Sequence, residues 1–233
     1  VFLSAFTTKT AVYVLLRAFP GTEILVWLGG MMAIYGIIYA VLENDIRRLL
    51  AYHIISQVGY MVAGVGIGNM MGINGAAAHA FSNILYKGLL FMVAGAVIHM
   101  TGKSKLTELG GLYKTMPLTF ILCMVAGLSI SAFPFFNGFI SKSMVVTAAA
   151  EEHLGPIWLM LMLASSGTFL SVGLKFTYFI FLGHDCGLRP KEPPLNMLMA
   201  MGLAGFLCIF IGVYPYPLYK VLPYDIEYSM YTA

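Results

Sequence analysis

The sequence predicts an all-α, polytopic membrane protein, and three observations support this fold class. First, 60% of the 233 residues are hydrophobic and only 10% are charged, whereas soluble domains contain about 25% charged residues. Second, the mean hydropathy is +0.86. Third, the apolar runs are about 17 to 25 residues long, which suits helices that cross a hydrocarbon core of about 30 Å, and not the short alternating strands of a barrel.

About seven membrane spans are predicted, separated by loops with helix breakers such as Pro20-Gly21 and Pro193-Pro194. The expected spans cover residues 2–19, 24–42, 49–67, 73–100, 117–150, 156–182 and 195–214. Because no long polar stretch interrupts them, residues 1–233 are expected to form a single transmembrane domain. The chain opens with Val1 inside an apolar segment, so we also expect it to be part of a longer protein or to lack its start.

The fifth span is too long for one crossing, since a helix over residues 117–150 would measure about 50 Å at 1.5 Å per residue. In its middle, the run SISAFPFFNGF contains Pro134, which cannot donate a helical hydrogen bond, and Gly138. We therefore predict two half-helices with an unwound link near Pro134, an arrangement often found at transport sites. The alternative is a long continuous helix that is kinked at Pro134.

The loops differ in charge, and this difference predicts an orientation. One set of loops contains Arg47, Arg48, Lys103, Lys105, Lys114, Arg189 and Lys191. The other set, with the C-terminal tail, contains Arg17, Lys220, Glu151 and Glu152. Because Lys and Arg are enriched in cytoplasmic loops, we expect the first set to face the cytoplasm. The N-terminal end would then be cytoplasmic and the C-terminus outside a cell inner (cytoplasmic) membrane.

Lysines, but no acidic residues, fall inside the predicted spans. These lysines are Lys9, Lys87, Lys142 and Lys175. A charged and unpaired lysine inside a membrane costs several kcal/mol, and a desolvated lysine can release its proton near physiological pH. Such residues are therefore candidate proton carriers, although a lysine near a span end can instead extend to the interface.

Lys87 is central in its span and shares one helix face with His79 and Asn83, because residues at i, i+4 and i+8 align. We predict that this stripe holds a hydrogen-bonded water chain. Lys142 would lie on the second half-helix, near the middle of the membrane. Both lysines are therefore predicted to be functional.

Alternatives stay open for three other polar residues. Lys9 has threonine neighbours, and its position in the sequence is equally compatible with a functional and a structural role. Lys175 lies about two turns from the end of its span, so extension to the interface competes with a relay role. His53 could relay protons toward the cytoplasm or bond a neighbouring helix.

Four sequence runs resemble, in the same order, motifs of the antiporter-like membrane subunits of respiratory complex I, of Mrp-type Na⁺/H⁺ antiporters (their D-type subunits) and of membrane-bound hydrogenases. These runs are ENDIRRLLAYHIISQVGYM, HAFSNILYKGLLFMVAG, LGGLYKTMPLT and LSISAFPFFNGFISKSMVV. The resemblance covers nearly all of the chain and is weaker after Leu182.

The resemblance implies a fold with two inverted five-helix repeats, each with a broken helix. This chain would supply the second repeat and flanking helices, from the family's helix eight onward, and the first repeat would be absent. The implied proton-translocating residues are Lys9, Lys87, Lys142 and His79, with Lys142 at the terminal proton site. Two departures are visible: Arg47 replaces a lysine, and Asn83 stands where many relatives have a second histidine.

The first functional hypothesis is a proton- or Na⁺/H⁺-translocating subunit of a multi-subunit membrane complex. Such a subunit is not catalytic alone, and it would belong to a redox-driven translocase or to a multi-subunit antiporter. The expected partners are lipid, H⁺ and possibly Na⁺, and other membrane subunits, including a chain that supplies the first repeat; nucleic acid is not expected. No cofactor or metal site is expected either, because Cys123, Cys186 and Cys208 lack metal or redox spacing.

Two other hypotheses remain. The chain could be a non-conducting structural half-module that is retained for assembly of the complex. A third and weaker hypothesis is a facilitator for an anionic solute that binds the buried lysines.

Overall fold

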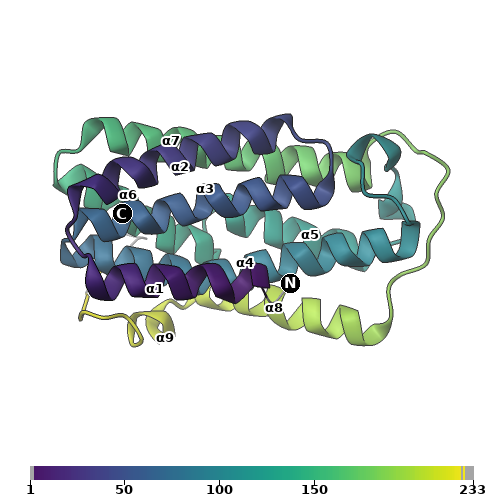
Figure 1. The fold of residues 1–233 in the computed structure, drawn as a ribbon. Helices are drawn as coiled ribbons and strands as arrows, with labels where there is room; N and C mark the ends of the chain where they lie inside the picture. The colour runs from purple at the N-terminus through teal and green to yellow at the C-terminus, as the bar shows by residue number, and fades with distance from the viewer. Residues whose placement is uncertain (1–2, 227, 229–233) are drawn as a thin grey trace.

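The computed structural model describes residues 3–226 and 228, and it consists of long helices that pack side by side (Figure 1). The elements are, in order, η1 (Leu3–Thr7), α1 (Thr8–Ala18), α2 (Glu23–Leu42), α3 (Ile46–Ile67), α4 (Met70–Thr101), η2 (Leu106–Glu108), η3 (Leu112–Lys114), α5 (Pro117–Ile130), α6 (Asn137–Glu151), α7 (Gly155–Thr168), η4 (Phe169–Phe176), η5 (Tyr178–Leu182), α8 (Leu195–Val213) and α9 (Tyr216–Tyr219). The described residues contain no β-strand, which confirms the predicted all-α class.

Five of the described helical runs are long and apolar enough to cross a membrane. They are α2, α3, α4, the run Gly155–Leu182 and α8. The in-line pair α5–α6 and the segment η1–α1 correspond to the two other predicted spans. Large apolar side chains such as Trp27, Met199 and Phe206 are exposed on α2 and α8, as expected for surfaces that face lipid or another apolar partner. The chain is a multi-pass membrane protein.

The break in the fifth span is confirmed. Helix α5 ends at Ile130, α6 begins at Asn137, and Figure 1 shows the two helices end to end. Between them, Ala132 and Phe135 have φ angles of 59° and 71°, a region that L-residues rarely adopt. The alternative of a continuous kinked helix is therefore wrong.

Helix α4 lies at the centre of the bundle, in contact with α1, α3, α5, α6 and α8. It is continuous and longer than predicted, and it begins at Met70 because the Asn69 side chain caps its first turn through the Gly72 amide. The span that follows α6 is irregular. It is an α-helix only to Thr168 and continues with π-helical geometry through η4 and η5, a geometry that is often found at functional sites.

Three loops, 43–45, 102–116 and 183–194, meet at one end of the bundle, which we call the charged end. The amide of Ile46 donates to the Ser104 carbonyl, and the amide of Leu106 donates to the Asn44 carbonyl, each at 2.9 Å. Glu192 caps α5 by accepting hydrogen bonds from the Leu118 amide at 2.7 Å and from Thr119. The prediction that the first two loops lie on the same side is confirmed, whereas their cytoplasmic placement stays a prediction.

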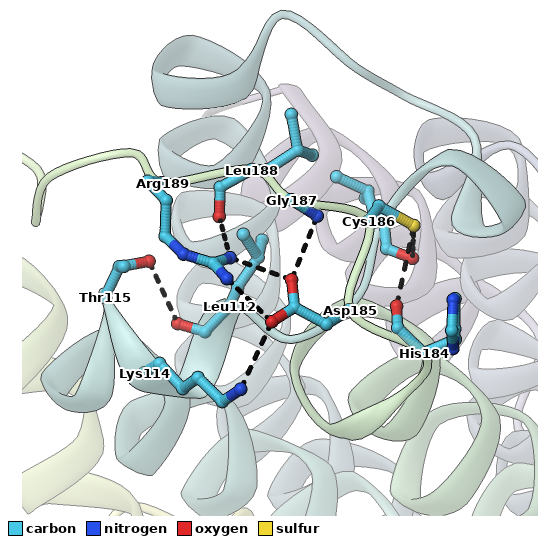
Figure 2. Close-up of polar contacts among 10 residues, drawn as sticks. Leu112, Lys114, Thr115, His184, Asp185, Cys186, Gly187, Leu188 and Arg189 are labelled. Atoms are coloured by element: carbon cyan, nitrogen blue, oxygen red, sulfur yellow. Dashed lines mark hydrogen bonds and ion pairs between the residues drawn. The ribbon is translucent and has the colours of Figure 1, made fainter.

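Asp185 anchors the third loop at the charged end (Figure 2). Its carboxylate forms ion pairs with Arg189 at 2.8 Å and with Lys114 at 3.2 Å, and it accepts a hydrogen bond from the Gly187 amide. The Arg189 hydrogen bonds, followed by those from Gly187 and Lys114, hold the pKa of Asp185 well below its usual range. The predicted positions of the two chain ends concern Val1 and Ala233, which lie outside the described residues.

Candidate functional site

Lys142 bridges the two halves of the broken helix. It lies on α6 and is 3% exposed, and its Nζ donates to the carbonyl of Ile130, the last residue of α5, at 2.7 Å. The same Nζ lies 5.1 Å from the centre of the Tyr60 ring. Because the C-terminal carbonyls of a helix carry a partial negative charge, they stabilise a cation without pairing it with a full counter-charge.

Lys87 is fully buried on α4. Its Nζ donates to the carbonyl of Leu50 on α3 at 3.0 Å and lies 5.8 Å from the centre of the Phe91 ring. Among the described residues, no carboxylate lies within 4 Å of the nitrogen of Lys87 or Lys142. Both ammonium groups are therefore held by neutral acceptors.

A chain of buried side chains crosses four helices beside these lysines. We call Ser141, His79, Tyr86, Gln57 and Thr168 the polar chain, and each is fully buried. His79 Nδ1 lies 2.9 Å from Ser141 Oγ on α6, and His79 Nε2 lies 3.4 Å from the Tyr86 hydroxyl. The Tyr86 hydroxyl donates to Gln57 Oε1 on α3 at 3.2 Å. Gln57 donates in turn to Thr168 on α7 at 3.4 Å.

The predicted stripe on α4 divides into two environments. Asn83 Nδ2 donates to the Tyr86 hydroxyl at 3.1 Å, so Asn83 bonds the polar chain to which His79 belongs. Lys87 instead bonds a carbonyl one helix away. The Oδ1 atom of Asn83 is buried without a protein partner among the described residues, and such an atom can bind an internal water. The water chain itself stays a prediction.

His53 lies on the same face of α3 as Gln57. Its Nε2 atom lies 2.7 Å from Ser171 Oγ on η4, so it bonds the neighbouring helix. Its Nδ1 atom is buried without a protein partner among the described residues. One ring nitrogen is therefore structural and the other is free for a water, which is compatible with either role that the sequence left open.

The hydrogen bonds of Lys9 and Lys175 go to groups outside the polar chain. Lys9 is 7% exposed and donates to the Ser4 carbonyl and to Thr8 Oγ1 at 3.2 and 3.1 Å. Lys175 donates to the carbonyls of Val41 and Glu43, at the C-terminus of α2, at 2.7 and 2.6 Å. Lys175 thus occupies a position that is typical of a cation that caps a helix.

A pocket of about 220 Å³ opens beside the helix break. It is lined by Ala132, Phe139, Lys142, Ser143, Val146, Met162 and Ser165. Because the pocket reaches Lys142, this lysine is buried but not sealed off from the surface of the chain.

Four residues that form these buried contacts escaped the sequence analysis, namely Tyr86, Ser141, Thr168 and Ser171. Each is an ordinary residue for a membrane helix, and each has a hydrogen-bond partner on another helix. The one available signal was local: Tyr86 directly precedes Lys87, and Gln57 follows His53 by one helical turn.

Comparison with known proteins defines the class to which this bundle belongs. Residues 1–171 match the family described as NADH:quinone oxidoreductase/Mrp antiporter, transmembrane. The chain belongs to this family, which confirms the resemblance of its four motifs.

Comparison with individual proteins supports the same family. An uncharacterised protein of Methanocaldococcus jannaschii is 35% identical over 91% of this chain and 46% of the relative. The A/B subunit of a probable K⁺/H⁺ antiporter of Rhizobium meliloti is 31% identical over 91% of this chain and 23% of the relative. A solved chain of the membrane-bound sulfane sulfur reductase, an archaeal respiratory membrane complex, superposes with a TM-score of 0.86 at 33% identity, over 94% of this chain and 40% of that chain. This chain thus spans less than half the length of each of these relatives.

Proposed function

We propose that this chain is an ion-translocating subunit, or part of one, in a multi-subunit membrane complex, and that it moves protons or exchanges Na⁺ for protons. One observation carries the proposal. Lys87 and Lys142 are buried in the bundle, and their ammonium groups bond backbone carbonyls and no described carboxylate. A lysine that has no counter-charge can lose its proton without leaving an unpaired anion behind.

Lys142 is proposed as the terminal site, since it lies at the helix break and lines the pocket there. Ser141, the residue before it, contacts His79, so the polar chain begins beside this lysine. Lys87 is proposed as the central carrier, with His79 and Asn83 as relay residues. His53 extends the relay toward the charged end, and Lys9 is proposed to link it to the family's first repeat.

The proposal also covers the setting of the chain. Residues 1–233 would form one transmembrane domain that corresponds to the second repeat, with the charged end facing the cytoplasm of a cell inner membrane. Other membrane subunits would supply the first repeat and the driving reaction. The relatives support this setting, because one belongs to a probable antiporter and another to a respiratory membrane complex.

The proposal is tested by Lys142→Met in the complete complex, assayed in inverted membrane vesicles. We expect the complex to assemble and ion uptake into the vesicles to fall at least about tenfold, because methionine fills much of the volume but cannot bind a proton. The control is Lys191→Met, which removes an exposed loop lysine. If Lys142→Met vesicles transport ions at the wild-type rate, the structural half-module becomes the better account.

A further inference from the structure

Tyr86 is a core residue with an unexplained polar atom. Its side chain is fully buried against α3 and lies among the largest buried side chains of the described structure. A phenylalanine ring would fill almost the same space without a hydroxyl to desolvate. Because a buried hydroxyl destabilises a core unless it is hydrogen-bonded, the partners of the Tyr86 hydroxyl indicate what it does.

Three side chains converge on this one oxygen. Asn83 Nδ2 donates to it at 3.1 Å, it donates to Gln57 Oε1 at 3.2 Å, and His79 Nε2 lies 3.4 Å away. A hydroxyl has one proton and two lone pairs, and the Asn83 amide occupies one lone pair. The proton and the remaining lone pair are therefore shared between His79 and Gln57.

The charge of His79 decides how they are shared. A neutral His79 with its proton on Nδ1 donates to Ser141 and needs a donor at Nε2, so the Tyr86 proton turns toward the histidine. A protonated His79 donates from both nitrogens, so Tyr86 must accept from Nε2 and turn its own proton toward Gln57. The hydroxyl can satisfy either state by rotating about one bond.

We infer that Tyr86 is a positioning residue for ion translocation: its hydroxyl orients His79 and binds both the neutral and the protonated ring, which links the histidine to α3. This inference rests on the proposed function. It assigns to Tyr86 no proton of its own to release, because the hydroxyl keeps one proton in both states.

Tyr86→Phe tests the inference in vesicles that contain the complete complex. We expect assembly to be retained and ion uptake to fall about tenfold, because a charged donor at His79 loses its acceptor. The matched control is Tyr52→Phe, a half-buried tyrosine of α3 whose ring stacks on Tyr39 and which lies outside the polar chain. Wild-type uptake by an assembled Tyr86→Phe complex would overturn the inference.

A second variant separates positioning from packing. Asn83→His in the Tyr86→Phe background places an imidazole acceptor one turn from His79, and we expect this double variant to restore most of the ion uptake that Tyr86→Phe loses. A double variant that assembles but takes up ions no faster than Tyr86→Phe would mean that the hydroxyl is structural. If the Tyr86→Phe complex does not accumulate, Gln57→Leu removes the same bond from α3, and wild-type uptake by that variant would equally overturn the inference.

Lys142→Met is measured beside these variants. If Lys142→Met loses ion uptake but Tyr86→Phe keeps it, only the role of Tyr86 is refuted, and the proposed function stands. Normal uptake in Lys142→Met would refute the proposed function itself.

Discussion

Cations at the charged end of the bundle and cations inside it are held by different kinds of partner. At the charged end, Lys114 and Arg189 both bind the Asp185 carboxylate, as Figure 2 shows. Inside the bundle, Lys87 and Lys142 bind the carbonyls of Leu50 and Ile130.

The difference has a physical consequence. An exposed ion pair contributes little free energy, about 0–1 kcal/mol, but it favours the charged form of both partners. A backbone carbonyl stabilises an ammonium group through a dipole alone, so the lysine can become neutral and leave an uncharged acceptor. The charged end is thus suited to anchoring loops, and the interior is suited to gaining and losing protons.

Gly138→Ala should break the interior arrangement most strongly. A Cβ atom at position 138 would overlap the Ser129 carbonyl oxygen, so the half-helices would separate and Lys142 would lose its contact with Ile130. Overpacking of this kind costs about 1–3 kcal/mol, and we expect the midpoint of thermal unfolding in detergent to fall by about 3–10 °C. Gly202→Ala is the control, because a Cβ atom there meets no atom within 4 Å; equal effects of the two variants would contradict the close approach.

Lys175→Met should sharpen the comparison between anchoring cations and proton-exchanging cations, since Lys175 lies within a span but caps a helix. Removing its two bonds to the carbonyls of Val41 and Glu43 should lower the free energy of unfolding by about 1–2 kcal/mol. Ion uptake per assembled complex should stay near the wild-type value. A loss of uptake with unchanged stability would instead place Lys175 in the relay.

The sequence predicted what depends on local composition, namely the spans, the break near Pro134 and the lysines without carboxylates. It could not predict the polar chain, because the contact between Tyr86 and Gln57 depends on how α4 is rotated against α3. The π-helical run after Thr168 was equally hidden, since its residues are as apolar as those of an ordinary helix. Contacts between distant helices are set by packing, and no single stretch of sequence encodes them.

Asp185→Asn should have the smallest effect. It weakens the ion pairs of the 183–194 loop, so limited proteolysis should cut this loop faster, while the midpoint of thermal unfolding stays unchanged. Because the pKa of Asp185 is depressed in the folded protein, the contact contributes fully above the unfolded value of about 4 and is lost only as the pH falls well below it. Rapid cleavage of the wild-type loop already at pH 5 would contradict this anchoring role.

The central claim is that a fully buried lysine held by a carbonyl, such as Lys87, exchanges protons, whereas a lysine held by a carboxylate, such as Lys114, does not. The most direct test is the number of ions moved per turnover of the driving reaction, measured in the same vesicles for Lys87→Met, Lys87→Arg and Lys114→Met. Both Lys87 variants should lose at least about nine-tenths of the coupled ion movement, since arginine keeps its proton in this pH range, and Lys114→Met should keep the wild-type ratio. Wild-type ratios in all three variants would contradict the account.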